Sequence, residues 1–262
     1  MTDIYQEIVR IRAGGEEAAL VTIVSAIGST PREEGAKMLV RADGSIVGSI
    51  GGGGLEAQVC DRAMEVIRKG KPQRSHISLA AKQGEELGMV CGGDIEVFIE
   101  PILPPPTLYI FGGGHMSLPV AKIGKLVDFK IVVIDDRAEF ANLQRFPEAE
   151  LTLAEGFNKA FSKLQINKSS YIVIVTRNHQ YDELVLEWAL GTQAKYIGML
   201  GSKTKNKVIF SHLLAKGIPQ EQLDKVHTPI GLEIYAQTPE EIAVSILAEI
   251  IKVRRSQLPD NR

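Results

Sequence analysis

The sequence predicts an α/β protein of two domains: a C-terminal domain built on a mainly parallel sheet and a smaller, mixed α/β N-terminal domain. Its 262 residues suit two domains of about 150 residues or less. After residue 107, strand-like and helix-like segments alternate, which is typical of a parallel sheet covered on both faces. The densest proline cluster, PILPPP at 101–106, is expected to be a stiff connector. We therefore expect domains at 1–100 and 107–262.

The predicted N-terminal elements follow from periodicity and turn residues. Residues 4–13 have helical spacing of apolar side chains, and 20–27 form an apolar run typical of a buried strand. Two further strands, at 36–41 and 45–50, are joined by the turn residues Ala42-Asp43-Gly44. A run of four glycines then precedes a helical pattern that ends at Gly70, a typical C-cap. A last strand is predicted at 95–99.

The C-terminal domain begins with a strand at 108–111, and further strands are expected at 130–134, 171–175 and 195–200. Helical patterns separate them. The clearest helix start is Thr238-Pro239-Glu240-Glu241, which combines a capping box with proline at the first helical position. An apolar stripe over 242–251 follows, so a buried C-terminal helix is predicted.

Composition excludes several classes of protein. Hydrophobic residues make up 44% and charged residues 24%, as in soluble globular proteins. The formal charge of −2 indicates neither nucleic acid nor a membrane surface as a partner. The N-terminus lacks the apolar stretch of a signal peptide, and no run approaches the roughly 18 residues of a membrane span. A cytoplasmic protein is expected. Cys60 and Cys91 are too few for a disulfide framework or a tetrahedral zinc site.

The strand at 108–111 leads into a glycine motif of the form G-x-G-x-x-S. Such a turn allows close backbone approach, and the helix that follows attracts a phosphate at its N-terminus. Asp135 ends the next strand, 23 residues beyond Gly112, where a dinucleotide-binding fold places an acid for a ribose hydroxyl. Arg137 is a candidate for pairing with an extra phosphate. The pattern predicts a Rossmann-like domain that binds a dinucleotide; the alternative is a Rossmann-like turn that binds nothing. The motif residues are Gly112, Gly113, Gly114, His115 and Ser117.

Polar residues near the ends of other segments are further candidates. His115 starts a helix over the presumed ligand, and His179 follows the strand at 171–175, with Asp182 three residues on. Catalysis, metal binding and helix capping are all open for these three side chains.

The N-terminal domain offers a second set. The glycine run with Glu56 is a candidate anion nest or a flexible turn, and Arg32 could reach a phosphate or be an ordinary exposed arginine. Cys91 is either a reactive thiol or a packing residue. The run consists of Gly51, Gly52, Gly53 and Gly54.

Taken together, the motifs resemble the XdhC/CoxI family, the xanthine dehydrogenase accessory factors. The match follows the order of the chain through most of its length. It comprises GSTPREEGAKMLVRADGSIVGSIGGGGLE at 28–56, VCGGDIEVFIEP at 90–101, IFGGGHMSLPVA at 110–121, VIDDR at 133–137, TRNHQYD at 176–182, YIGMLGSKTK at 196–205, and HTPIGLEIYAQTPEEIAVSILAEI at 227–250.

The resemblance implies a chaperone of the molybdenum cofactor (molybdopterin), which it would bind transiently. Members of the family are thought to assist sulfuration of the cofactor with a cysteine desulfurase and to deliver it to a xanthine dehydrogenase-type apo-enzyme. They are not themselves complete hydroxylases. This chain agrees, because two cysteines cannot supply the four thiolates of an iron–sulfur cluster. A homodimer is the expected oligomeric state.

Two positions depart from the family pattern. The family's first block commonly reads GGGCLE, and Gly54 replaces its cysteine here, so a thiol role would fall to Cys91 or be absent. The family's TH motif has Arg177 at its histidine position, whereas His179 and Asp182 are kept. Both changes suggest a branch with a different client or cofactor form.

The sequence therefore predicts a cofactor site at 112–115 with Asp135 and Arg137 on its polar groups, closed by Arg32, the glycine run and Cys91. No catalytic residue is assigned. One alternative is an NAD(P)-dependent oxidoreductase, for which His179 would be the general acid. Another is a ligand-free scaffold that recruits the desulfurase and the hydroxylase.

Overall fold

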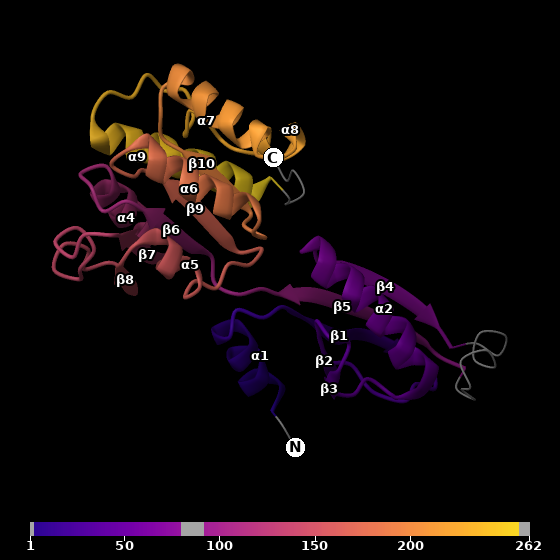
Figure 1. The fold of residues 1–262 in the computed structure, drawn as a ribbon. Coiled ribbons are helices and arrows are strands. Elements are labelled where there is room, and N and C mark those ends of the chain that lie inside the picture. Colours follow the sequence, from indigo (N-terminus) through magenta and orange to yellow (C-terminus); the bar gives the residue numbers. More distant parts are fainter. Residues whose placement is uncertain (1–2, 80–91, 257–262) are drawn as a thin grey trace. The chain divides into compact units, whose positions relative to one another are not determined.

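The computed structural model describes residues 3–79 and 92–256 (Figure 1). The chain divides into two compact units, Met1–Pro104 and Pro105–Arg262. The division lies inside the proline-rich segment, although the first two residues of that segment, Pro101 and Ile102, pair with β1 as part of a strand. Each unit is described by itself below.

The N-terminal unit contains a five-stranded sheet in the order β3-β2-β1-β5-β4, and each pair of neighbours is antiparallel. Alternate side chains of β1 enter different cores. Ala19, Val21 and Ile23 pack beneath α2, whereas Ala18 and Leu20 pack with α1. The elements are α1 (Ile4–Ala13), β1 (Ala18–Ile27), β2 (Lys37–Arg41), β3 (Ile46–Gly48), α2 (Gly53–Lys69), β4 (Gln73–Ser78) and β5 (Asp94–Ile102).

The C-terminal unit contains a five-stranded parallel sheet in the order β10-β9-β6-β7-β8. The chain winds outward from β6 through β7 to β8, then returns to the other side of β6 for β9 and β10. Ligands bind such sheets at the carboxyl edge, where the winding direction reverses. The strands are β6 (Thr107–Phe111), β7 (Lys130–Asp135), β8 (Leu151–Ala154), β9 (Ser170–Ile174) and β10 (Tyr196–Met199).

Helices cover both faces of this sheet (Figure 1). Leu108 and Ile110 of β6 pack in a core shared with α4 and α9, and Tyr109 and Phe111 pack in a core shared with α5, α6 and α7. This three-layer arrangement confirms the predicted α/β class with a Rossmann domain. The helices are α4 (Ser117–Leu126), α5 (Phe157–Phe161), α6 (His179–Leu190), α7 (Lys203–Ala215), α8 (Gln220–Leu223) and α9 (Pro239–Arg255).

Two predicted helix signals are confirmed in detail. Gly70 has the left-handed φ of 63° at the C-cap of α2, and its amide bonds the Val66 carbonyl. Thr238 and Glu241 form a reciprocal capping box at the start of α9. Among the described residues, no helix has the length and apolar character needed to cross a membrane.

Candidate functional site

The glycine turn after β6 passes so close to neighbouring backbone that side chains are excluded from its first two positions. Gly112 has a φ of 108°, and its amide donates to the Ile134 carbonyl at 2.7 Å. A Cβ on Gly112 would lie 2.4 Å from the Val175 carbonyl oxygen, and one on Gly113 would lie 2.0 Å from that of Phe140. Gly114 differs, because its Cβ would meet no described atom within 4 Å. The open side of the turn is therefore at Gly114.

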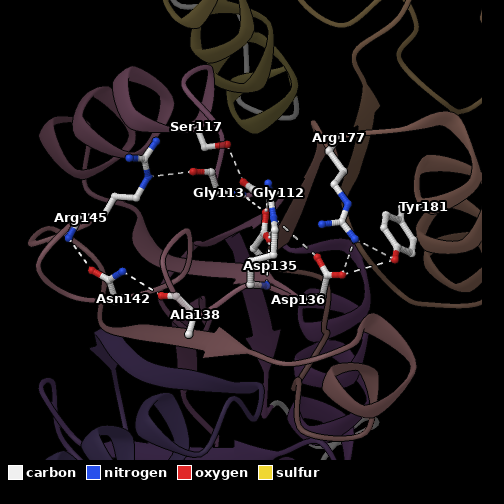
Figure 2. Close-up of polar contacts among 11 residues, drawn as sticks. Gly112, Gly113, Ser117, Asp135, Asp136, Ala138, Asn142, Arg145, Arg177 and Tyr181 are labelled. Atoms are coloured by element: carbon white, nitrogen blue, oxygen red, sulfur yellow. Dashed lines mark hydrogen bonds and ion pairs between the residues drawn. The ribbon is translucent and has the colours of Figure 1, made fainter.

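Two side chains donate hydrogen bonds to the carbonyls of this turn. The buried Ser117 hydroxyl donates to the Gly112 carbonyl at 2.5 Å, which gives a structural role to the serine of the G-x-G-x-x-S motif. Arg145 Nε donates to the Gly113 carbonyl at 2.9 Å, and the Arg145 amide in turn bonds Asn142 Oδ1 (Figure 2). The turn is thus held in shape by contacts within the protein itself.

Asp135, at the end of β7, is 2% exposed and is committed to protein donors. Its Oδ2 accepts from the Gly113 amide at 2.8 Å and from Arg137 Nη2 at 3.0 Å, and its Oδ1 accepts from Arg137 Nε and the Arg137 amide. Burial raises the pKa of Asp135, but these hydrogen bonds outweigh it, so the pKa lies below the usual value. Asp135 is therefore a charged anchor of the glycine turn.

Arg137, predicted to contact the ligand, binds Asp135 with one side of its guanidinium. The guanidinium also lies over the ring of Phe140, 3.6 Å from its centroid. Arg145 stacks near the same ring at 5.2 Å. Phe140, whose carbonyl blocks the position of a Gly113 Cβ, is therefore in contact with two arginines beside the turn. A ligand contact by Arg137 stays a prediction.

A second polar group bridges the ends of two strands. Arg177 Nη2, after β9, donates to Asp136 Oδ2 at 2.7 Å, and Asp136 follows Asp135 at the end of β7. The Tyr181 hydroxyl lies 3.0 Å from the same Arg177 nitrogen and 3.3 Å from Asp136 Oδ2 (Figure 2). Because β6 lies between β7 and β9 in the sheet, this bridge spans the strand that carries the glycine turn.

The loop after β9 is stabilised by a buried carboxylate. Asp182 is 1% exposed; its Oδ1 accepts from the Thr176 amide at 3.2 Å and lies 2.7 Å from the Thr176 hydroxyl. Its Oδ2 pairs with Lys205 at the start of α7. Asn178 caps α6 by accepting from the Tyr181 amide. Catalysis, metal binding and helix capping were left open for Asp182, and these contacts fit a structural role that fixes the loop after β9.

His115 and His179 are both exposed; His115 lies two residues before α4, and His179 is the first residue of α6. Across residues 3–79 and 92–256, no group of three or more His, Cys, Asp or Glu side chains is placed to hold a metal ion. Ligand contacts by these two histidines stay predictions.

In the N-terminal unit, the glycine run already holds a carboxylate of its own chain. Glu56 Oε1 accepts from the amides of Ile50 and Gly52, each at 3.0 Å, and from the Ser49 hydroxyl at 2.7 Å. Burial raises the pKa of Glu56, but these donors outweigh it and the net pKa is lowered. An external anion would have to compete with Glu56 for these donors.

The remaining N-terminal candidates are placed as follows. Arg32 is exposed, and its role in ligand binding stays a prediction. Cys91 lies outside the described residues. Cys60 is partly buried on α2, and burial, together with Glu56 and Asp61, raises the pKa of its thiol, which disfavours a reactive thiolate.

Sequence reasoning did not single out Asp136, Arg145 or Lys205. Asp136 could have been found from the sequence, because it directly follows Asp135, the acid predicted at the end of a strand. Arg145 lies in a long loop without periodicity, and Lys205 reaches Asp182 from another strand–helix unit, so neither contact could be inferred from spacing.

The fold defines a protein with a Rossmann-type domain and a second α/β unit built on an antiparallel sheet. Residues 108–250 match the family model for the XdhC Rossmann domain, and residues 11–78 match that for the XdhC and CoxI family. The chain belongs to the XdhC and CoxI family, as its resemblance predicted.

Three curated relatives differ in length. The uncharacterized protein YqeB of Escherichia coli K12 is 35% identical over 97% of this chain and 47% of its own length. A probable xanthine dehydrogenase subunit from Bacillus subtilis 168 is 32% identical over 61% of this chain and 46% of its own. The molybdenum cofactor insertion chaperone PaoD of E. coli K12 is 24% identical over 100% of this chain and 92% of its own. This chain thus spans about half the length of the first two.

A solved structure covers the whole chain as well. The crystal structure of a xanthine dehydrogenase from Bacillus halodurans is 25% identical, with a TM-score of 0.53, and the match covers 100% of this chain and 98% of that one.

Proposed function

We propose that this protein is a maturation factor that binds the molybdenum cofactor and assists its insertion into a xanthine dehydrogenase-type enzyme. Membership of the XdhC and CoxI family supports this, as does similarity over 92% of the length of PaoD, an insertion chaperone. The observation that carries the proposal is the glycine turn at the carboxyl edge of the parallel sheet, which is braced on one side and open at Gly114.

The turn offers what a phosphorylated pterin requires. It leads into α4, whose N-cap residue Met116 provides no side-chain cap to the helix amides. The helix dipole favours an anion at this end, and the absence of a Gly114 side chain leaves room for a phosphate to approach the backbone. The pterin phosphate would bind here, and the rest of the cofactor would extend along the carboxyl edge.

The contacts of Asp135 weigh against the NAD(P) alternative. A dinucleotide-binding fold needs this acid for a ribose hydroxyl. In this protein its oxygens already accept four hydrogen bonds, from Gly113 and Arg137. Freeing Asp135 for a ribose would leave the Gly113 amide without its acceptor, so nicotinamide binding demands a rearrangement that pterin binding does not.

The proposal extends to sulfuration of the cofactor with a cysteine desulfurase and to a homodimeric state. The enzyme supplied would be a xanthine dehydrogenase-type apo-enzyme, a client consistent with the name of the B. subtilis relative. Transfer is tested by incubating cofactor-loaded protein with cofactor-free enzyme and measuring the hydroxylase activity gained, with and without the desulfurase. Sedimentation measures the oligomeric state.

The primary test is extraction of the bound ligand. The protein is purified anaerobically from a host that makes the cofactor, then denatured and oxidised, and the extract is separated by chromatography. Near-stoichiometric fluorescent pterin is the expected result. Nicotinamide nucleotide without pterin would favour the oxidoreductase, and neither ligand, even after reconstitution with added cofactor, would favour the scaffold.

A pair of variants locates the ligand. Gly114→Leu should abolish pterin retention while the protein stays folded, because the side chain would enter open space where the phosphate approaches. Gly191→Leu is the matched control: among the atoms that the structure describes, a Cβ there meets only the Trp188 carbonyl, at 3.5 Å, at the C-terminal end of α6. Equal pterin content in both variants would show that the ligand does not lie at Gly114.

A further inference from the structure

The bridge between Asp136 and Arg177 lies across the sheet position at which the proposed ligand binds. Asp136 is at the end of β7 and Arg177 follows β9, and β6, with the glycine turn at its end, lies between them. A ligand that extends from the turn along the carboxyl edge therefore meets this ion pair. Figure 2 shows the pair and Tyr181 drawn together with the turn residues Gly112 and Gly113.

The ion pair can be broken at little cost. The Arg177 side chain is 38% exposed and that of Asp136 is 22% exposed. Exposed pairs of this kind typically change an equilibrium constant by less than about fivefold. A doubly charged phosphate that accepts two parallel N–H bonds is a stronger partner for a guanidinium than a partly hydrated carboxylate.

Arg177 also has unused donors. Its hydrogen bonds to the described part of the chain all use Nη2, toward Asp136 and the Tyr181 hydroxyl. Its guanidinium carbon lies 5.0 Å from the centroid of the Tyr181 ring. The ring therefore supports one end of the guanidinium, and Nε and Nη1 are available to a ligand.

We propose that Arg177 is a phosphate-binding residue of the site, held by Asp136 in the free protein and exchanged to a phosphate ester of the ligand on binding. This rests on the proposed function, because it assumes an anionic ligand at the glycine turn. Asp136 is then a competitor for Arg177 and not a ligand contact. The role differs from that of the acid in a dinucleotide site, which binds a sugar hydroxyl itself.

Substitution of Asp136 distinguishes the two roles: affinity should rise if Asp136 competes with the ligand for Arg177, and fall if Asp136 contacts the ligand itself. Asp136→Asn removes the competing carboxylate and its repulsion of the phosphate, so affinity should rise by about two- to fivefold. Arg177→Ala should lower affinity by about tenfold or more, the usual loss for a charge-assisted hydrogen bond. Arg177→Lys should fall between wild type and Arg177→Ala, because an ammonium cannot form the two-pronged contact.

Matched controls separate these effects from net charge. Glu187 and Lys216 form an exposed ion pair between α6 and the C-terminal end of α7. Glu187→Gln removes one negative charge, as Asp136→Asn does, and Lys216→Ala removes one positive charge, as Arg177→Ala does. Neither control touches the carboxyl edge, and both should leave affinity unchanged.

Two probes are used at constant ionic strength: freshly released molybdenum cofactor, retained under anaerobic conditions, and inorganic pyrophosphate, titrated by calorimetry. The inference holds if Asp136→Asn binds the probes more tightly than Glu187→Gln, and if Arg177→Ala binds them more weakly than Lys216→Ala. It is overturned if Asp136→Asn weakens binding or either variant matches its control. Pyrophosphate binding that depends on Arg177 without retention of cofactor would overturn the proposed function alone. Cofactor retention insensitive to Arg177 would overturn this inference alone.

Discussion

Gly113 and Gly114 are neighbours in one turn but face different surroundings. A Cβ on Gly113 would lie 2.0 Å from the Phe140 carbonyl oxygen, whereas one on Gly114 would meet no atom of the described residues within 4 Å. Gly113→Ala should therefore destabilise the C-terminal unit by about 1–3 kcal/mol, as overpacking does. Gly114→Ala should cost far less. Trp188, the single tryptophan of the sequence, lies in this unit, so urea unfolding followed by its fluorescence measures both variants. Equal midpoints would contradict the close contact at Gly113.

Asp135 should influence ligand affinity indirectly, by holding the glycine turn in shape. Asp135→Ala leaves the Gly113 amide and the Arg137 guanidinium without their acceptor. We expect the variant to lose about 1–3 kcal/mol in ligand binding and to lower the urea midpoint as well. Weaker binding at unchanged stability would instead indicate that Asp135 contacts the ligand directly.

The sequence could predict the glycine turn and the acid beside it, because both lie at strand ends with a known spacing. It could not predict their partners. The pairing of Arg137 with Asp135 is decided by the rotamers of two side chains only two positions apart. Asp136 and Arg177 are 41 positions apart and meet because β7 and β9 flank β6, which requires the strand order.

At the scale of elements, one buried acid links α1 to the N-terminal sheet in addition to their shared apolar core. Glu7 bonds Arg10 of the same helix and Arg41 of β2, and these two side chains lower the pKa of Glu7 to about 2. An acid with a depressed pKa stabilises the fold above its unfolded pKa of 4.5, and this contribution is lost as the pH falls toward 2.

Glu7→Gln should therefore be less stable than wild type at neutral pH, and the difference should shrink between about pH 4.5 and pH 2. Far-UV circular dichroism follows both units, while Trp188 fluorescence follows only the C-terminal one. The shift should appear in the first signal and leave the second unchanged. Glu33→Gln, an exposed substitution in the same unit, is the control. A pH-independent difference would contradict a role for the Glu7 charge.

Element prediction succeeded where apolar periodicity was strong, and it found the outer strands β3 and β10 but missed the other two. Helix α1 has the predicted bounds, and β1, β6, β7 and β9 lie close to theirs. Strands β4 and β8 were not predicted. Both are outer strands of their sheets, and β4 reads QRSHIS, in which only every second residue faces the core and two of those are small or polar. Half-covered edge strands bury too few apolar side chains to give a clear pattern.

At the scale of the whole molecule, the two family models fall in different units. The model matched by residues 11–78 lies in the first unit, and that matched by residues 108–250 lies in the second. Each hydrophobic core also draws its residues from one unit. The proposed ligand edge can therefore be analysed through the C-terminal unit within the intact chain, using Trp188 as its reporter.

Three described side chains hold the turn: the Ser117 hydroxyl, the Asp135 carboxylate and the Arg145 guanidinium. Because these contacts lie within the protein, a cofactor that binds there as proposed would meet a turn that needs little further ordering. Association should then follow a single exponential at a rate set by encounter. Differences between cofactor forms would appear as differences in residence time. A carrier built in this way would control delivery through the lifetime of its complex with the cargo.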